Sequence, residues 1–551
     1  MYSYLRTLSL PEQAEYLTQM LVRQKSYTLT YGEVEKAEWI ADLIGQFPYF
    51  SDHPENVWIS EIKEDSLSRK NVFAFLPSSK EVKETVVYHS HIDTVGTEDY
   101  GAIQDIAHDP QGLKEFFSSS PNDPELEEDA ASGQWLFGRG ALDMQSGIAV
   151  HLVNLLYYCE NREEVPGNLL VMFNPDEEGE HAGIRSALSE LISLKEKKGL
   201  HYVAAINNDF ISPLADGDET KYIYTGAAGK LLPSFAVFGR ESHVGESLLG
   251  VDSTLIAAEL NTRINQNFHL TEKLSDELVL PPSCLYMRDE KKRYDVQTAV
   301  TSRIFFHYFI YEKPLQTVTD ELVKIAAEAC TAIEKRLEDT FELYRKTNNL
   351  PKRDVNWAIE VLTLKDLLDR LNREGIETEE IISETLHLCQ LAKMDARMTA
   401  FEIVEALQHA DPEKKPRVIL FYGTPFLPSN SLSESESKGN SLRSKLMNIL
   451  EQTSAETGET FKVRKYFPYL ADGSFMSFQG SEEDISTLRK NFPAMDALFP
   501  LPLKTMTQLN IPSINLGVFG KGGHKWTERV YKPYTFHTLP KLIRDFTNSI
   551  L

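Results

Sequence analysis

Histidine and acidic side chains end several of the apolar stretches in this sequence, and these residue types are common ligands of transition metals. In each case a run typical of a buried strand is followed by a possible ligand. These residues are His91 in VVYHSHID, Asp143 in LFGRGALD, Glu177 and Glu178 in LLVMFNPDEEGE, Asp209 in VAAINNDF and His524 in INLGVFGKGGHK. A single H-x-D is more typical of a solvated loop after a strand, so a metal site requires that these stretches share one sheet.

Clustered carboxylates without a cation would repel one another, because like charges a few Å apart disfavour joint ionisation. Divalent ions remove that conflict, and imidazole with carboxylate oxygen suits zinc, with cobalt or manganese as alternatives. The candidate ligands are His91, Asp143, Glu178, Asp209 and His524. Five ligands are too few for two separate metal sites unless one carboxylate bridges both ions. Such a bridge would hold the two ions roughly 3.5–4 Å apart. The ions would leave roughly one positive charge to activate water and stabilise an oxyanion.

The remaining polar residues receive separate roles. Asp93 follows His91 by two positions, where it can accept the second ring N–H and fix the tautomer. Glu177 adjoins Glu178 but should point away from it, so it is a candidate general base beside the activated water. His89 lies on the same strand face as His91, yet we expect it to line the pocket rather than bind metal.

The expected elements explain how these residues could meet. Between residues 70 and 225, short apolar runs alternate with helical patterns, which predicts an α/β fold with helices packed on a mainly parallel sheet. Ligands collect at the carboxyl ends of such strands. From about residue 230, two strand-helix units, such as LLPSFAVFGRESHVG followed by VDSTLIAAELNTRINQ, indicate a smaller inserted α+β domain.

The runs PRVILFYGTPFLPSN and IPSINLGVFGKGGHK are both predicted to re-enter the first sheet. We therefore expect a catalytic domain formed by residues 1–228 and 366–551, with an inserted domain at 229–365. The second boundary falls in a stretch, 340–415, that is hard to place.

Composition narrows the classes of partner and compartment. The chain has 551 residues, with 82 acidic against 57 basic residues and a formal charge of −25, which disfavours nucleic acid and anionic membranes as partners. Its 4 cysteines lack the spacing of a zinc ribbon or a disulfide framework, which fits a reducing compartment. We see neither a signal peptide nor an apolar run of the roughly 18 residues that a membrane helix needs. The sequence therefore predicts a cytoplasmic protein.

Four stretches, SHIDTV, GRGALDMQSG, NPDEEGEHAG and GKGGHKWTERVY, resemble the catalytic-domain motifs of the M20 metallopeptidases. They occur in the family's order across most of the chain. That family includes carboxypeptidases, dipeptidases and N-acyl-amino-acid deacylases. The resemblance implies a zinc-peptidase-like domain and two zinc ions, with Asp143 as the bridge and Glu177 as the base. The implied ligands are His91, Asp143, Glu178, Asp209 and His524.

The inserted domain resembles the family's lid. GRESHVGESLLGVDSTLIAAEL is similar to the lid segment, which implies that His243 contacts the scissile carbonyl. In many members this histidine reaches the active site of a partner subunit, so either a homodimer forms through the lid or this long chain supplies its own lid contacts. Chain length and the ending GGHKWTERVYKPYTFHTLP look most like an arginine-utilisation branch. The context NNDFISP departs from the family pattern, so Asn207, Asn208 and Asp216 remain alternatives to Asp209. Asp472 fits either a pocket wall or a solvated turn.

These observations favour a hydrolase that cleaves an amide bond of a peptide or N-acyl amino acid, with arginine or amino-acid catabolism as its context. One alternative is a catalytically silent relative that binds a ligand, although the ligand and base positions are intact. Another is a mononuclear non-haem iron oxygenase, whose metal-binding triad also matches H-x-D with a distant histidine. That reading leaves Asp143 and the DEE motif without a role.

Overall fold

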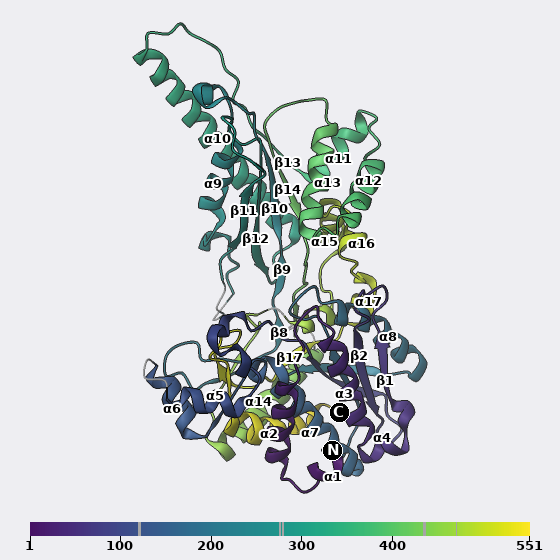
Figure 1. Ribbon diagram of the computed structural model, residues 1–551. Coiled ribbons are helices and arrows are strands. Elements are labelled where there is room, and N and C mark those ends of the chain that lie inside the picture. Colours follow the sequence, from purple (N-terminus) through teal and green to yellow (C-terminus); the bar gives the residue numbers. More distant parts are fainter. Residues whose placement is uncertain (120–122, 275–276, 278–279, 433–436, 470) are drawn as a thin grey trace. The chain divides into compact units, whose positions relative to one another are not determined.

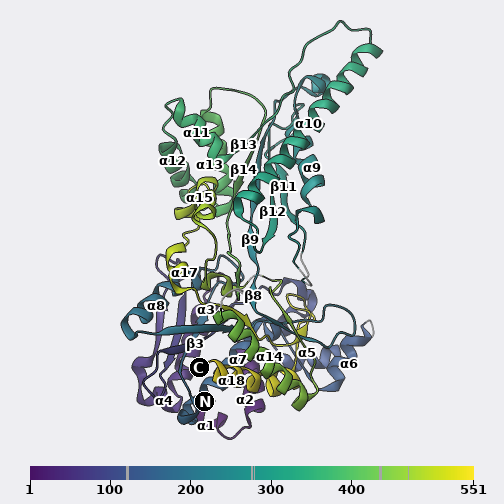
Figure 2. The ribbon, with the colours of Figure 1, turned by 180° about the vertical axis from the view of Figure 1, so that it is seen from behind.

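The computed structural model describes residues 1–119, 123–274, 277, 280–432, 437–469 and 471–551. The chain forms two compact units. Unit 1 contains Met1–Ala228, Ser429–Phe478 and Pro502–Leu551, and unit 2 contains Gly229–Pro428 and Gln479–Leu501. Figures 1 and 2 show both units, which are described separately below. Among the described residues, no helix combines the length and the apolar character that crossing a membrane requires.

Unit 1 is built on an eight-stranded mixed sheet with the order β1-β2-β5-β3-β6-β17-β7-β16. The strands are β1 (Val57–Glu61), β2 (Lys70–Leu76), β3 (Glu84–His91), β5 (Asn168–Asn174), β6 (His201–Asn207), β7 (Lys221–Tyr224), β16 (Phe461–Arg464) and β17 (Ser513–Asn515). The four central strands, β5, β3, β6 and β17, run parallel. Their carboxyl ends therefore meet at one edge, as the alternating sequence pattern predicts.

Helices bury the central strands, which explains the apolar runs within β3, β5 and β6. The helices α3 (Gly32–Gly45) and α7 (Ser146–Glu160) share one hydrophobic core with β2, β3 and β5. Behind α7 lie α2 (Leu10–Arg23) and α18 (Leu539–Ile550), and α8 (Ala182–Lys198) packs on β2 and β5. The remaining helices of unit 1 are α1 (Tyr2–Leu5), α4 (Pro48–Asp52), α5 (Pro110–Phe117), α6 (Pro124–Ser132), α14 (Ser437–Thr457) and α17 (Leu503–Leu509). The predicted α/β class is confirmed.

A separate three-stranded sheet joins two distant parts of unit 1. Its order is β18-β19-β4, with β4 (Trp135–Phe137), β18 (Gly520–Lys521) and β19 (Arg529–Tyr531). Because β19 pairs with both neighbours, the chain after β4 lies beside the turn between β18 and β19. The stretch INLGVFGKGGHK is thus not one strand of the main sheet: β17 ends at Asn515, and the chain then crosses to this smaller sheet.

Unit 2 has its own sheet, with the order β11-β12-β10-β14-β13 and β9 paired to β12. The strands are β9 (Gly229–Leu231), β10 (Pro233–Phe238), β11 (Ser283–Asp289), β12 (Thr301–Ile310), β13 (Glu360–Thr363) and β14 (Arg417–Tyr422). Two helices, α9 (Ser253–Ile264) and α10 (Leu315–Thr347), lie on one side of it (Figure 1). The helices α11 (Leu364–Arg373), α12 (Thr378–Leu391) and α13 (Ala396–Ala410) lie on the other (Figure 2).

The extent of unit 2 differs from the predicted insertion. It begins at Gly229, the predicted start, but it continues to Pro428 instead of ending at 365, and it also takes up 479–501. The reason is that RVILFY does not return to the first sheet; as β14 it pairs with β10 and β13. The helices α11 and α13 then bury a hydrophobic cluster against β10, β12 and β14, so residues 366–428 fold with unit 2.

Candidate metal centre

Six predicted site residues come together within unit 1. His91 is the last residue of β3, while the Glu177–Glu178 pair and Asp209 follow the ends of β5 and β6. Asp143 follows β4, and His524 lies between β18 and β19. The parallel strands and the three-stranded sheet thus deliver side chains from distant segments to one place.

The imidazoles of His91 and His524 face opposite oxygens of one carboxylate. His91 Nε2 lies 2.9 Å from Asp143 Oδ1, and His524 Nε2 lies 2.9 Å from Asp143 Oδ2. His524 Nε2 is also 2.8 Å from Glu178 Oε1. Asp143 therefore has the geometry of a bridge between two groups of ligands.

Three overlapping sets of side chains place their ligand atoms within 4.8 Å of one another. The sets are His91 with Asp143 and Asp209, His91 with Glu177 and Glu178, and Asp143 with Glu178 and His524. All five predicted ligands occur in these sets, and His91, Asp143 and Glu178 each occur in two. A network of shared donors is what two neighbouring cations would require.

The electrostatics of the cluster favour bound cations. Burial and the negative charge of Asp143 raise the pKa of both Glu178 and Asp209. Burial opposes a charged His524, but its hydrogen bonds to Asp143 and Glu178 raise its pKa to about 11. Without a metal, the cluster therefore holds protons on its carboxylates or on its imidazoles. Divalent ions would take the place of these protons. Imidazole nitrogen with carboxylate oxygen is a donor set that zinc accepts, so the residues fit the implied metal.

Asp93 holds the backbone of the DEE turn. Its Oδ1 accepts a hydrogen bond from Glu177 N at 3.0 Å, and its Oδ2 accepts from Glu178 N at 3.1 Å and from Thr28 Oγ1 at 2.9 Å. His91 Nδ1 lies 3.1 Å from the backbone oxygen of Asp93 and 3.4 Å from its Oδ1. Asp93 therefore lies against the ring of His91, and it also links β3 to the two glutamates.

The loop that carries Asp143 needs a glycine at one position. Gly140 has a φ of +81°, and a Cβ there would lie 2.7 Å from Cγ2 of Thr94 and 3.0 Å from Cγ of Gln145. A side chain would therefore push the loop away from the segment that follows His91. The GRGALD motif thus brings its aspartate close to the H-x-D motif.

Comparison with known proteins identifies the family. Residues 87–344 match the model of peptidase family M20/M25/M40. Protein RocB of Bacillus subtilis (strain 168) is 48% identical over 550 residues, covering 100% of this chain and 97% of RocB. This chain belongs to the M20 peptidase family, in the branch of RocB. The uncharacterized protein YqjN of the same organism is 32% identical over 536 residues, covering 96% of this chain and 95% of YqjN.

Solved structures of two peptidases share the fold. A tripeptidase from Staphylococcus aureus superposes with a TM-score of 0.53 at 13% identity, covering 98% of each chain. The M20 metallo-carboxypeptidase Sso-CP2 from Sulfolobus solfataricus gives a TM-score of 0.50 at 10% identity, covering 98% of this chain and 99% of its own. The family prediction is confirmed, and this M20 protein is a metal-dependent hydrolase.

Two residues within the M20-like motifs were not predicted to matter. The buried carboxylate of Glu528 accepts hydrogen bonds from Leu142 N at 3.0 Å and Asp143 N at 3.1 Å, and it pairs with Arg139 Nη1 at 2.6 Å. Arg139 Nε also donates to the backbone oxygen of Gly96 at 2.9 Å. This ion pair ties together the segments that carry His91, Asp143 and His524. The only sequence signal for this ion pair is that one motif contains an arginine and the other a glutamate.

The alternatives to Asp209 have other surroundings. Asn208 Nδ2 donates to the backbone oxygen of Gly147 at 2.5 Å and its Oδ1 accepts from Ser90 at 2.9 Å, so it fastens the start of α7. Asp216 is exposed, and Asn207 is buried at the end of β6. Asp216 belongs to none of the sets of metal-ligand geometry found among the described residues.

The other polar candidates lie at the edge of the centre or outside unit 1. His89 is buried, burial lowers its pKa to about 3, and it belongs to no ligand set found among the described residues. Asp472, at the start of η7 (Asp472–Met476), is buried with its Oδ1 3.0 Å from His181 Nδ1, so it is not in a solvated turn. His243 is an exposed residue of unit 2, before η5 (Val244–Leu249), and its Nδ1 accepts from Gly245 N at 3.1 Å.

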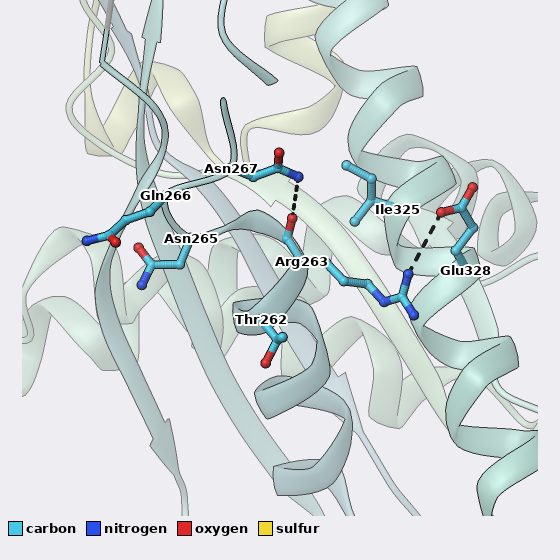
Figure 3. A pocket seen from close by; sticks show the side chains of 7 residues that line it. All are labelled: Thr262, Arg263, Asn265, Gln266, Asn267, Ile325 and Glu328. Atoms are coloured by element: carbon cyan, nitrogen blue, oxygen red, sulfur yellow. Dashed lines mark hydrogen bonds and ion pairs between the residues drawn. The ribbon is translucent and has the colours of Figure 1, made fainter. Parts of the chain in front are cut away.

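Unit 2 also has a polar depression between α9 and α10, with a volume of about 330 Å³ (Figure 3). Within its lining, Arg263 pairs with Glu328 at 3.9 Å, and Asn267 Nδ2 donates to the backbone oxygen of Arg263 at 2.7 Å. It contains no histidine or cysteine.

Proposed function

We propose that the protein hydrolyses an amide bond of a small peptide or N-acyl amino acid with two divalent ions in the centre of unit 1. The observation that carries this proposal is the position of Asp143, whose two oxygens face His91 and His524 within shared sets of ligands. We propose His91, Asp143, Glu178, Asp209 and His524 as the ligands. Zinc fits the mixture of imidazole and carboxylate best, and cobalt or manganese can use the same donors.

Bound divalent ions would polarise the scissile carbonyl and make water a better nucleophile. The residues of this chain supply the proton transfers. Glu177 Oε1 is buried without a hydrogen-bond partner among the described residues, while Glu177 Oε2 lies 4.0 Å from His91 Nε2. We therefore assign Glu177 as the base that accepts the proton of water and delivers it to the leaving amine. Asp93 positions Glu177 through the turn backbone.

We assign His243 of the lid, unit 2, to the scissile carbonyl, acting in its own or a partner subunit. A homodimer through the lid is supported by β11, which pairs only with β12 among the described strands. Its Leu285 and Met287 are 55% and 41% exposed, and such edges favour pairing with another chain. We propose a role in arginine or amino-acid catabolism in the cytoplasm, which the resemblance of the sequence to an arginine-utilisation branch supports. The net charge of −25 disfavours nucleic acid and anionic membranes as partners.

Elemental analysis with a substrate screen tests the reaction. Purified protein should carry about two transition-metal ions per chain, and metal-replete protein should cleave members of a panel of dipeptides, tripeptides and N-acyl amino acids. Folded protein that binds no metal would refute the proposal. A single iron with oxygen-dependent turnover would replace it with the oxygenase, and zinc-loaded protein that cleaves no member of the panel would support a silent relative.

A mass measurement in solution tests the dimer. Wild-type protein should have the mass of two chains, and Leu285→Asp should shift it toward one chain, because a carboxylate at an edge strand opposes pairing. A wild-type mass of one chain would contradict the dimer and leave the reaction untouched.

A further inference from the structure

The two glutamates of the DEE motif lie on a turn that is held from two sides. Asp93 holds one side by accepting the N–H groups of Glu177 and Glu178. On the other side is Asp176, which is fully buried and has a φ of +68°, in the left-handed region that non-glycine residues rarely adopt. Something must hold Asp176 in this conformation, because the turn would otherwise relax.

Asp176 is fixed by its backbone and by its side chain. Its N–H donates to Glu33 Oε1 at 2.9 Å, and its carbonyl oxygen accepts from His181 N at 2.8 Å. Its Oδ2 accepts from Ala182 N, at the start of α8, at 2.9 Å, and its Oδ1 forms an ion pair with Arg69 Nη1 at 2.7 Å. The polar groups of this residue are thus tied to three segments: the first turn of α3, the start of α8 and the residue before β2.

Arg69 and Glu33 come from outside all four M20-like motifs. Arg69 immediately precedes β2 and is 4% exposed, and Glu33 is in the first turn of α3 with no exposed surface. Arg69 Nη1 lies 3.7 Å from Glu33 Oε2, and Arg69 Nη2 lies 2.7 Å from Asp65 Oδ1. One buried guanidinium therefore lies within ion-pair distance of three carboxylates. Two of these, Glu33 and Asp176, hold the turn.

We propose that Arg69, together with Glu33, is a positioning residue that sets the placement of Glu177 and Glu178. The inference rests on the proposed function, in which these glutamates are base and ligand. Without the guanidinium, the carboxylate of Asp176 would stay buried but lose the ion pair that its Oδ1 forms with Arg69, and a buried charge without its partner is strongly destabilising. Because Asp176 directly precedes Glu177, any shift that relieves this cost moves the turn that carries both glutamates.

The structure places Arg69 against Asp176 and not against the ligands themselves. Its loss should therefore affect turnover more than substrate binding. Partners that orient a metal ligand or catalytic group typically contribute roughly 10- to 100-fold to activity. Lysine retains the charge but not the planar fork, so it should restore part of the loss.

The test compares Arg69→Met, Arg69→Lys and Glu33→Gln with wild-type protein. We expect Arg69→Met to lower kcat roughly 10- to 100-fold with KM within about twofold, and Arg69→Lys to recover part of kcat. The visible absorption of cobalt-loaded protein should change in Arg69→Met, since Glu178 lies on the displaced turn. Glu33→Gln keeps an acceptor for Asp176 N, so it should have the smallest effect. If Arg69→Met fails to fold, Arg69→Lys must still show a lower kcat and an altered cobalt spectrum.

Lys221→Met is the matched control. Lys221 is also a buried cation of unit 1, 2% exposed, and it pairs with Glu459 at 3.1 Å and lies 4.0 Å from the ring centre of Phe519. It should lose stability while keeping kcat and the cobalt spectrum. The proposal is overturned if Arg69→Met matches Lys221→Met in kcat and spectrum. Inactive wild-type protein would refute the proposed function instead, and the cobalt spectra would still decide the role of Arg69.

Discussion

Replacing Glu177 with glutamine should abolish turnover and stabilise the metal-free protein. Without metal, burial, together with negative charge from Glu178 and Asp472, raises the pKa of Glu177 well above its ordinary value of 4.5. A carboxyl group whose pKa rises on folding contributes stability below the unfolded value that is lost as the pH rises toward the folded value. Glutamine does not titrate, so the variant avoids this loss.

The size of the effect follows from the linkage between protonation and folding. Each pH unit between the unfolded and folded pKa values costs about 1.36 kcal/mol, so from 4.5 to pH 7 the wild type loses at most about 3.4 kcal/mol. At pH 7 the free energy of unfolding of metal-free Glu177→Gln should therefore exceed that of metal-free wild type by up to this amount. Near pH 4 the two free energies of unfolding should converge. Turnover of the metal-loaded variant should fall roughly 10²- to 10⁴-fold, the usual contribution of a general base.

Urea unfolding of chelator-treated proteins at several pH values measures the first effect. Elemental analysis and kcat of metal-loaded proteins measure the second, and the variant should keep its metals because Glu177 is not among the assigned ligands. Glu196→Gln is the control, since Glu196 is an exposed residue of α8. The reasoning fails if Glu177→Gln is less stable than wild type at pH 7, or if its kcat remains within tenfold.

Three further predictions concern the same centre. Removing metal with a chelator should abolish turnover and lower the unfolding temperature, both restored by zinc or cobalt; activity that survives removal would contradict metal dependence. Asp93→Asn loses one of the acceptors for Glu177 N and Glu178 N, so it should cost about 1–3 kcal/mol in urea unfolding and lower kcat roughly 10- to 100-fold, whereas unchanged kcat would contradict its role. Glu528→Gln turns an amide toward Arg139 and should weaken metal binding roughly 10- to 100-fold in competition with a chelator; wild-type affinity would show that this ion pair does not position the ligands.

The sequence predicted the elements whose pattern is local. The strands β3, β5 and β6 each contain an apolar run and end in polar residues, so their type and the end of the sheet that they share could be predicted. The strand β14 looked the same but was assigned to the wrong sheet. An apolar run does not specify its neighbour, and the register that pairs Ser234 with Phe421 is a contact between distant segments.

The same limit applies to the candidate site. The sequence could suggest four of its residues because each ends or follows an apolar run within a motif: His91, Asp143, Glu178 and His524. Arg69, Glu33 and Glu528 were not proposed, because a buried ion pair is formed by residues far apart in sequence. Their sequence context is that of ordinary charged residues near the ends of helices and strands, and only the fold shows that they are buried.

His89 and His91 illustrate why position along a strand matters more than residue type. Both side chains lie on one face of β3, since side chains alternate along a strand. His89 pairs in register with Met172 and Asn207 inside the sheet, where no carboxylate of the ligand sets reaches it among the described residues. His91 is the last residue of the strand, so the loop with Asp143 can approach it. Loops can reach a side chain at the carboxyl end of a strand but not in its middle. One of two histidines on the same face of β3 therefore meets the other ligands, and the other is enclosed by the neighbouring strands.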